Sequence, residues 1–268
     1  ARRLQELGVE GLFVIGGNGS LTGAHVLAAH APCSVVGAPA SIDNDVGYSR
    51  LSIGVDTAVN TIVEACDRIS DTARAHRRAF VVEVMGRHCG YLAMRAGIAA
   101  DADAILFAER QRSAPDTIDA LKKLLSRSFS AERGKKRVLI IKAEGVDLPT
   151  ADLVQALQAH LDAEVPGVGI RETILGHVVR GGNPSATDRL IAQRLGGAAV
   201  FALEGGTTDV MLAWEAPREV GSATADPSVR QIGLGDVLDE THRMLSGQSP
   251  ATQARVQLLL TAERLLAL

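Results

Sequence analysis

Short apolar runs alternate with helix-length amphipathic segments through most of this chain. The apolar runs are bounded by glycine, proline or polar residues, and they fall at positions 12–15, 34–37, 79–84, 104–107, 138–143, 173–175 and 210–214. Strands that are apolar along their whole length are typical of parallel sheets covered by helices on both faces. The alternation therefore predicts an α/β fold with mostly parallel sheets.

The segments between these runs have the length and the spacing of amphipathic helices. They span residues 20–30, 55–76, 90–100, 115–129, 151–163 and 185–203. Segment 55–76 is the longest, and its charged residues alternate with apolar ones as expected of a helix that spans between two lobes. We therefore expect a domain boundary near residue 55.

The composition is that of an ordinary soluble globular protein. The 268 residues are 46% hydrophobic and 22% charged, with a formal net charge of -3. Lys and Arg form no continuous stripe and only 3% of the residues are aromatic, which argues against a nucleic-acid surface. No apolar run reaches the length of a membrane span and no signal peptide opens the chain, so we expect no membrane contact and a cytoplasmic location.

The three cysteines carry little information about function. Cys33, Cys66 and Cys89 are widely spaced in apolar or glycine-rich surroundings. Their odd number and their spacing indicate neither a disulfide framework nor a zinc site. We therefore expect them to be core thiols.

A glycine-rich turn follows the first apolar run directly. It reads Gly16-Gly17-Asn18-Gly19-Ser20 and leads into the helical segment 20–30. Where a strand, a glycine turn and a helix amino terminus follow one another, backbone amides converge and the helix dipole favours an anion such as phosphate. The alternative is a glycine turn that serves only the backbone geometry.

An acidic segment follows the second apolar run. Residues 38–45 read Ala-Pro-Ala-Ser-Ile-Asp-Asn-Asp, and Pro39 disfavours helix for the residue before it. Asp43 and Asp45 are therefore expected in a loop at the carboxyl end of a buried strand, where open α/β sheets bind ligands. Two nearby carboxylates raise each other's proton affinity, and either one suits a hydrated Mg²⁺. The alternative is an Asx turn in which Asp43 and Asn44 hydrogen-bond the loop backbone.

Four motifs in this order resemble the 6-phosphofructokinase family. They are the glycine-rich turn, the acidic segment, Met85-Gly86-Arg87, and residues 175–182, which read Leu-Gly-His-Val-Val-Arg-Gly-Gly. The resemblance covers most of the chain, although its carboxyl-terminal part matches only in outline. It implies two Rossmann-like lobes with the active site in the cleft between them. The larger, nucleotide-binding lobe would comprise residues 1–55 and 179–235, and the smaller, sugar-phosphate-binding lobe residues 56–178 and 236–268.

The resemblance also bears on the start of the chain. Relatives carry an earlier strand and phosphate loop that bind part of the nucleotide, and no such elements precede residue 16 here. The first eight residues have a helical pattern that ends at Gly8, as expected of a chain cut inside a helix.

The reaction implied by the resemblance is the glycolytic transfer of the γ-phosphoryl group of ATP to the 1-hydroxyl of fructose 6-phosphate. Asp43 would be the general base that takes the hydroxyl proton, a role worth about 10²–10⁴ in rate. Asp45 would orient the metal or the nucleophile. Ser41, where many members have threonine, would hydrogen-bond a phosphoryl oxygen, and Arg87 would meet a phosphate or an interface acid.

The donor site implied by the resemblance is a triphosphate cradle in the glycine-rich turn. Its residues would be Gly16, Gly17, Gly19, Ser20 and Gly23. Asn18 departs from the pattern, because most relatives have aspartate there to help hold Mg²⁺. An amide is a weaker ligand for a hard dication than a carboxylate, so Asn18 would be a weak Mg²⁺ ligand. Asp45 would be the other candidate ligand.

The acceptor site implied by the resemblance lies in the smaller lobe. The clamp for the sugar phosphate would be Arg78, Arg171, His177 and Arg180, and the sugar would contact Met85, Gly86, Arg87 and Glu144. Arginine suits a dianionic phosphate because its planar guanidinium binds two oxygens at once. In relatives the counterparts of Arg78 and Arg171 reach across from a neighbouring subunit. This implies self-association, as a dimer or a tetramer, with shared sites.

Effector control is a further implication. Asp103 with Lys135 and Lys136 falls where some bacterial members bind an effector nucleoside diphosphate, which would make the protein allosteric. Ser70 stands where those proteins have arginine, however, and a solvated surface is the alternative reading of the lysine pair.

Other functions remain open from the sequence. Pyrophosphate-dependent family members carry an acid and a lysine where Gly19 and Ala40 stand, so these small residues favour ATP as the donor. A catalytically silent homologue that only binds sugar phosphates is supported by Asn18 and by the missing first phosphate loop. A nicotinamide-dinucleotide kinase would not need the arginines beyond residue 170. A redox dinucleotide-binding domain would need a G-x-G-x-x-G turn with an acid about twenty residues later, which does not follow Gly16.

Overall fold

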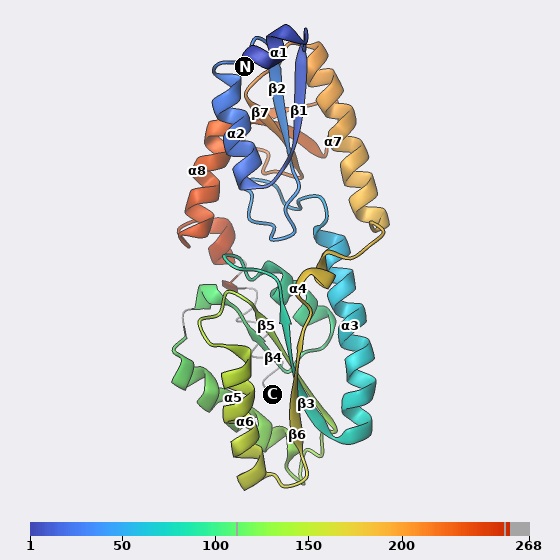
Figure 1. The fold of residues 1–268 in the computed structure, drawn as a ribbon, viewed down its shortest axis with the longest axis vertical. Helices are drawn as coiled ribbons and strands as arrows, with labels where there is room; N and C mark the ends of the chain where they lie inside the picture. Colours follow the sequence, from blue (N-terminus) through green and yellow to red (C-terminus); the bar gives the residue numbers. More distant parts are fainter. Residues whose placement is uncertain (111, 255, 258–268) are drawn as a thin grey trace. The chain divides into compact units, whose positions relative to one another are not determined.

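The computed structural model describes residues 1–110, 112–254 and 256–257, and Figure 1 shows its ribbon. The described residues form two sheets with helices on their faces, so the predicted α/β class with mostly parallel sheets is confirmed. The chain divides into two compact units. The first comprises Ala1–Thr57 and Gly182–Thr252, and the second comprises Ala58–Gly181 with the described residues after Thr252.

The sheet of the first unit has the strand order β1-β2-β7-β9-β8. The bounds are Gly11–Gly16 for β1, Ser34–Pro39 for β2, Val210–Trp214 for β7, Ser222–Ala223 for β8 and Val229–Gly233 for β9. Strands β1, β2 and β7 are parallel, as the apolar runs predicted, and β9 pairs antiparallel with both β7 and β8. The sequence analysis missed β8 and β9, because β8 lies in a turn-rich segment and Arg230 and Gln231 interrupt the apolar pattern of β9.

Helices cover both faces of this first sheet. Helices α2 (Asn18–Ala28) and α8 (Leu234–Leu245) lie on one face and α7 (Ala186–Glu204) lies on the other (Figure 1). Leu21 of α2 packs in one buried cluster with Met211 and Leu234. Val36 and Leu212 point to the opposite face and pack with α7. The short helix α1 (Arg2–Glu6) precedes β1.

The expected lobes differ from the observed units at the carboxyl end. We placed residues 236–268 in the smaller lobe, but α8 belongs to the first unit because Leu234 and Val237 are fully buried against α2 and β9. That part of the lobe assignment is therefore wrong up to Thr252. Residues 258–268 lie outside the described residues. The units divide after Thr57 and after Gly181, whereas the expected lobe boundaries fell after residues 55 and 178.

The sheet of the second unit is entirely parallel, in the order β4-β5-β3-β6. The bounds are Arg78–Val84 for β3, Ala104–Leu106 for β4, Arg137–Ala143 for β5 and Gly169–Ile174 for β6. Strand β6 begins at Gly169, before the predicted start at residue 173. As an edge strand it carries exposed Arg171 and Glu172, and these charged residues interrupt the apolar run from which the start was predicted.

Helices also cover both faces of the second sheet. Helices α5 (Ala114–Phe129) and α6 (Thr150–Glu164) pack on one face through a buried aliphatic cluster that includes Leu125, Leu157 and Ile140. Helices α3 (Val55–His76) and α4 (Tyr91–Ala99) lie on the other side (Figure 1). Two short 3₁₀ helices, η1 (Ala108–Arg110) and η2 (Gly176–Arg180), follow β4 and β6.

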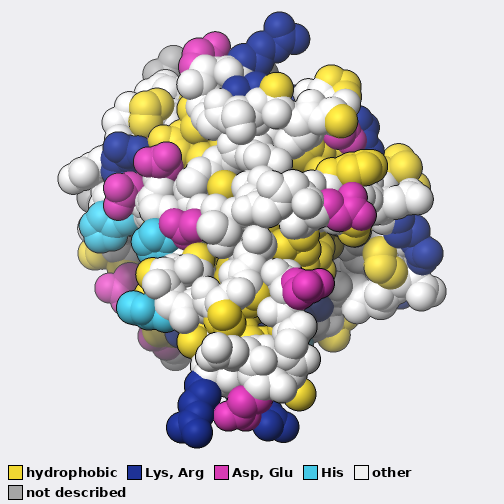
Figure 2. Space-filling model, turned by 90° about the horizontal axis from the view of Figure 1, so that it is seen from above, with side chains coloured by type: hydrophobic (Ala, Val, Ile, Leu, Met, Phe, Trp, Pro, Cys, Tyr) yellow, Lys and Arg dark blue, Asp and Glu magenta, His cyan; other side chains and the backbone are white. Residues whose placement is uncertain are grey.

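The charged surface is mixed rather than one-signed. Figure 2 shows Lys and Arg side chains interspersed with Asp and Glu on the face that it displays. Among the described residues, none of the helices combines the length and the apolarity that a bilayer crossing needs.

All three cysteines are buried thiols, so the prediction of core thiols is confirmed. Burial, with a smaller contribution from Asp67, raises the pKa of the Cys66 thiol to about 11. At about pH 8 only about one Cys66 thiol in a thousand is then ionised. We expect mass spectrometry to find Cys66 unmodified after iodoacetamide treatment of the native protein, and alkylated after unfolding in urea. Rapid alkylation of Cys66 in the native protein would contradict this environment.

Candidate active site

The glycine-rich turn joins β1 to α2 in the first unit. Gly17 precedes the first turn of α2, and no side chain caps this helix end. The N-cap residue therefore accepts no hydrogen bond from the first amides of α2 through a side chain, and uncapped amides of this kind bind phosphate at helix amino termini. A Cβ atom on Gly16 would lie 2.5 Å from Ser20 Oγ, so the close approach of Ser20 requires glycine at this position.

Gly19 and Gly23 form a bare strip on α2. Both are exposed, and a Cβ atom on either would meet no other atom within 4 Å. Because they are four residues apart, they lie on the same face of the helix. A ligand can therefore approach the helix backbone along this strip without meeting a side chain.

The acid loop, residues 40–54, begins at the carboxyl end of β2 and lies against the glycine-rich turn. Ala40 N–H donates to the carbonyl oxygen of Gly16 at 2.9 Å. A Cβ atom on Gly17 would lie 3.4 Å from Ser41 Cβ. The turn and the acid loop thus form one half-site at the carboxyl edge of β1 and β2, which we call the first half-site.

Asp45 connects the two parts of the first half-site. Its Oδ2 accepts a hydrogen bond from Asn18 Nδ2 at 2.8 Å, and its Oδ1 accepts one from Ser41 Oγ at 2.9 Å. The side chain is buried. Neutral donors therefore hold both oxygens of this carboxylate.

Asn44 shapes the loop next to Asp43, which is half-buried. Asn44 is fully buried and has a left-handed backbone with φ of 51°, a conformation that asparagine tolerates better than most residues. Its Nδ2 donates to the carbonyl oxygen of Arg50 at 3.0 Å, and its Oδ1 accepts from Ser52 N–H at 2.9 Å. Asn44 thus hydrogen-bonds the loop backbone, as the alternative interpretation expected, but its partners lie six and eight residues further along the chain, so these bonds do not form an Asx turn.

The first half-site does not fit a metal ion held by the protein. Within the described residues, no group of three or more His, Cys, Asp or Glu side chains could hold a metal ion. The two expected ligands, Asn18 and Asp45, hydrogen-bond each other. Mg²⁺ in proteins is usually bound through one or two carboxylates plus waters and substrate phosphates, and here neutral donors already occupy both oxygens of Asp45.

The second half-site lies at the carboxyl edge of the second sheet. Met85, Gly86 and Arg87 follow β3, and Glu144 follows β5. Glu144 N–H donates to the carbonyl of the last β3 residue, Val84, at 2.9 Å, and Gly86 N–H lies 3.4 Å from Glu144 Oε1. Gly86 has φ of 130° and its Cβ would lie 2.6 Å from the Cys89 carbonyl oxygen, so only glycine suits this position.

His177 and Arg180 reach the same edge from η2, which follows β6 directly. Leu175 N–H donates to the Glu83 carbonyl oxygen at 3.0 Å, which keeps the end of β6 beside β3. His177, Arg180, Arg87 and Glu144 are all exposed. The structure thus brings six of the expected acceptor-site residues to one edge: Met85, Gly86, Arg87, Glu144, His177 and Arg180.

Arg78 and Arg171 lie toward the opposite edge of the same sheet. Arg78 is the first residue of β3, opposite Gly169, and Arg171 is opposite Phe80. At about 3.3 Å per residue, Arg78 is about 23 Å of strand away from Met85, which is farther than an arginine side chain reaches. One unit therefore does not bring the four clamp residues together.

A buried ion pair, which was not predicted from the sequence, supports the second half-site. Lys142 is 2% exposed, and its Nζ lies 3.1 Å from Glu83 Oε2, which also accepts a hydrogen bond from Thr150. Glu83 and Lys142 are paired residues of β3 and β5, just before the loops that carry Met85 and Glu144. The sequence signal for this pair was one charged residue inside each of two apolar runs, Glu83 in 79–84 and Lys142 in 138–143.

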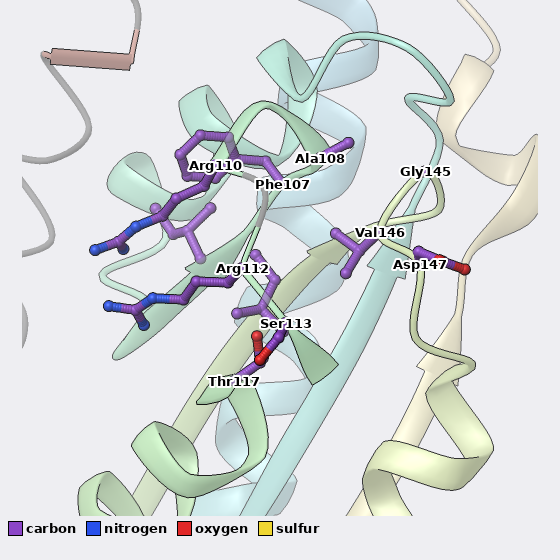
Figure 3. Close-up of a pocket in the computed structure, with 11 residues that line it drawn as sticks. Phe107, Ala108, Arg110, Arg112, Ser113, Thr117, Gly145, Val146 and Asp147 are labelled. Carbon is purple, nitrogen blue, oxygen red and sulfur yellow. The ribbon is translucent and has the colours of Figure 1, made fainter. Parts of the chain in front are cut away.

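A cavity of about 390 Å³ in the second unit is lined in part by Gly145, Val146 and Asp147, which follow β5 (Figure 3). Arg110 and Arg112 extend in the same direction on one side of it, and Val146 and Asp147 lie on the other (Figure 3). Burial and the neighbouring Arg112 cation lower the pKa of the Arg110 guanidinium. This cavity was not predicted, because its lining comes from segments far apart in the sequence.

The basic cluster considered for an effector lines a second cavity, of about 600 Å³. Lys135 bonds Asp103, and Arg137 donates to Ser70 Oγ at 2.8 Å and lies 3.3 Å from Asp101 Oδ2. Neighbouring side chains thus hydrogen-bond two of the cationic side chains that line this cavity, Lys135 and Arg137.

In each unit, considered by itself, candidate ligand loops follow the carboxyl ends of parallel strands, where open α/β sheets bind ligands. The chain belongs to the phosphofructokinase family, because the family model described as Phosphofructokinase matches residues 1–203.

Comparison with individual proteins agrees with the family. The chain is 45% identical over 213 residues to the ATP-dependent 6-phosphofructokinase of Thermotoga petrophila, covering 80% of this chain and 63% of that protein. It is 46% identical over 209 residues to the protein of the same name from Natranaerobius thermophilus, covering 78% and 61%. The chain thus spans a little under two thirds of the length of these relatives. The solved phosphofructokinase of Saccharomyces cerevisiae superimposes with a TM-score of 0.80 at 31% identity, covering 98% of this chain and 38% of that one.

Proposed function

We propose that this chain is the core of an ATP-dependent 6-phosphofructokinase that phosphorylates the 1-hydroxyl of fructose 6-phosphate. The observation that carries the proposal is the first half-site, where the glycine-rich turn and the acid loop are joined by hydrogen bonds at the ends of two adjacent parallel strands. The proposal is supported by relatives that are about 45% identical to this chain and are named ATP-dependent 6-phosphofructokinases. Cytoplasmic glycolysis is the setting that this activity implies.

In this proposal the uncapped amides of α2 and the bare strip of Gly19 and Gly23 receive the triphosphate. Asp43 accepts the proton of the attacking hydroxyl. Ser41 Oγ donates its single proton to Asp45, so it would hydrogen-bond a phosphoryl oxygen only by turning that proton from the carboxylate to the phosphate. Mg²⁺ would supply positive charge to the phosphates, and it would enter the first half-site already bound to ATP.

The acceptor is held in this proposal by the second half-site. Met85, Gly86 and Glu144 face the sugar, and His177 and Arg180 face its phosphate. Because Arg78 and Arg171 lie toward the other edge of the sheet, we propose that they complete the site of a neighbouring copy. Self-association as a dimer or a tetramer follows, since each site would be incomplete without its partner.

The donor is tested by an enzyme-coupled assay of the intact protein with fructose 6-phosphate. We expect turnover with MgATP and none with pyrophosphate, because an open strip at Gly19 leaves room for a nucleotide. Turnover with pyrophosphate alone would establish the other branch of the family. Binding of fructose 6-phosphate without turnover by either donor would establish a silent homologue.

Replacing Gly145 by alanine is expected to weaken fructose 6-phosphate binding at least about tenfold. A Cβ atom there would lie 2.0 Å from the Arg87 carbonyl oxygen and 3.0 Å from that of Gly86, so the loop that carries both residues must move. Backbone shifts of this kind in a binding loop typically cost 1–3 kcal/mol, where about 1.4 kcal/mol is tenfold.

Isothermal titration of the Gly145→Ala variant measures this effect. The matched control is Gly197→Ala on α7, where the added methyl group would meet no atom within 4 Å. Unchanged affinity in Gly145→Ala would separate this loop from the acceptor site.

A further inference from the structure

Asn18 and Asp45 make a direct side-chain contact between the glycine-rich turn and the acid loop. They are 27 residues apart in sequence, and Asn18 Nδ2 donates to Asp45 Oδ2 at 2.8 Å. Ser41 occupies the other carboxylate oxygen at 2.9 Å, and Asp45 is only 9% exposed. One buried charge is therefore held between two loops by neutral groups.

Hydrogen-bond chemistry fixes the orientation of the Asn18 amide. An ionised carboxylate only accepts hydrogen bonds, so the amide NH₂ group must face Asp45. Asn18 Oδ1 then points elsewhere, and it is buried without a hydrogen-bond partner among the residues that the structure describes. This oxygen remains available as an acceptor.

A carboxylate at position 18 would reverse this chemistry. Two carboxylates at hydrogen-bonding distance repel each other, and one of them must then bind a proton or share a cation. The amide avoids that need, because it supplies a donor where a carboxylate would supply a second negative charge. The link between the loops is thus complete without any ion.

We propose that Asn18 takes the place of a protein-held divalent cation as the link between the two loops. The first half-site is assembled without metal, and any divalent cation enters only with the phosphates of the nucleotide. Asn18 is therefore a positioning residue. The entry of the cation with the nucleotide rests on the proposed function, whereas the metal-free link between the two loops does not.

The metal dependence of stability tests the proposal in the absence of nucleotide. The melting temperature is measured at about pH 8, where carboxylates are ionised, with EDTA or with millimolar MgCl₂. For the unaltered protein we expect the two values to agree within about 1 °C. For Asn18→Asp we expect a value about 3–6 °C lower in EDTA, which MgCl₂ largely restores, since about 1–2 kcal/mol of repulsion shifts a protein of this size by that much.

Asn18→Ala is the matched control, because it removes the hydrogen bond without adding charge. We expect its melting temperature to fall equally in EDTA and in MgCl₂. If the role of Asn18 were purely structural, the melting temperature of Asn18→Asp would also fall equally in EDTA and in MgCl₂. Restoration of that melting temperature by Mg²⁺ therefore distinguishes the proposal from a purely structural role.

Electron paramagnetic resonance of added Mn²⁺ gives a second measurement, and its result for the unaltered protein does not depend on whether Asn18→Asp folds. We expect all Mn²⁺ to remain free with the unaltered protein and a bound fraction with Asn18→Asp. Nucleotide-free Mn²⁺ binding by the unaltered protein, or stabilisation of that protein by MgCl₂ to the extent seen in Asn18→Asp, would overturn the proposal. Neither measurement includes ATP or fructose 6-phosphate, so failure of the kinase assay would leave the first part of the proposal standing.

Discussion

Replacing Asp43 by asparagine or serine is expected to lower kcat by at least about two orders of magnitude, which is the usual contribution of a positioned general base. The KM for fructose 6-phosphate should change by less than about threefold, because the proton is transferred only in the transition state. Asp43 is half-buried in the acid loop beside Asn44, whose own hydrogen bonds hold the loop shape. The substitution therefore removes the base while the loop that carries it stays in place.

Steady-state kinetics with MgATP measures this effect. Asp239→Ser is the matched control, because Asp239 is an exposed acid on α8, away from the acid loop in sequence. We expect the control to retain the full kcat. Near-normal turnover in the Asp43 variants would assign the base to another residue.

Replacing Asp188 by alanine is expected to lower the free energy of unfolding by about 3–5 kcal/mol. Asp188 is 1% exposed, and its carboxylate accepts from the N–H groups of Gly54 and Thr57, each at 2.8 Å, and from Thr57 Oγ1. Alanine leaves these donors buried without an acceptor. The first unit would lose the connection between α7 and the end of the acid loop.

Urea denaturation measures the change for Asp188→Ala. Asp188→Asn keeps one acceptor oxygen and should lose less. The control is Asp236→Ala, since Asp236 also lies in the first turn of a helix but is exposed, and we expect a loss within about 1 kcal/mol. Equal losses in Asp188→Ala and Asp236→Ala would show that the buried network contributes little.

The regular part of the fold could be predicted because its strands contain continuous apolar runs bounded by glycine, proline or polar residues. Each of the seven predicted strands overlaps an observed one, and the long helix α3 begins and ends at the predicted residues. Prediction failed where burial is one-sided or interrupted. Strand β9 has two half-exposed polar residues, Arg230 and Gln231, between the buried Val229 and Ile232, and the edge strand β6 carries the exposed Arg171 and Glu172.

Helix α8 shows another limit of the sequence. Its amphipathic pattern was not recognised, and its residues were assigned to the wrong lobe. Chain order does not say which sheet a carboxyl-terminal helix covers. The packing of Leu234 and Val237 against α2 decides this, and that packing depends on tertiary contacts.

Within the candidate site, positions at strand ends were predictable and contacts were not. The turn 16–20, the acid loop and Met85-Gly86-Arg87 fall where the apolar runs end, as expected. The hydrogen bond between Asn18 and Asp45 joins residues on different loops, so spacing alone could not reveal it. The same holds for Asp188 and for the pair of Glu83 and Lys142.

The central claim is that the site is shared, with Arg78 and Arg171 serving a neighbouring copy. The most direct measurement is the activity of a mixture of two variants, Asp43→Ser and Arg171→Ala, each nearly inactive alone. If sites are shared, random re-association places both defects in some sites and leaves others intact. We predict that the mixture recovers about a quarter of the unaltered activity, as expected for reciprocal two-fold interfaces. A mixture no more active than the mean of the separate variants would contradict the account.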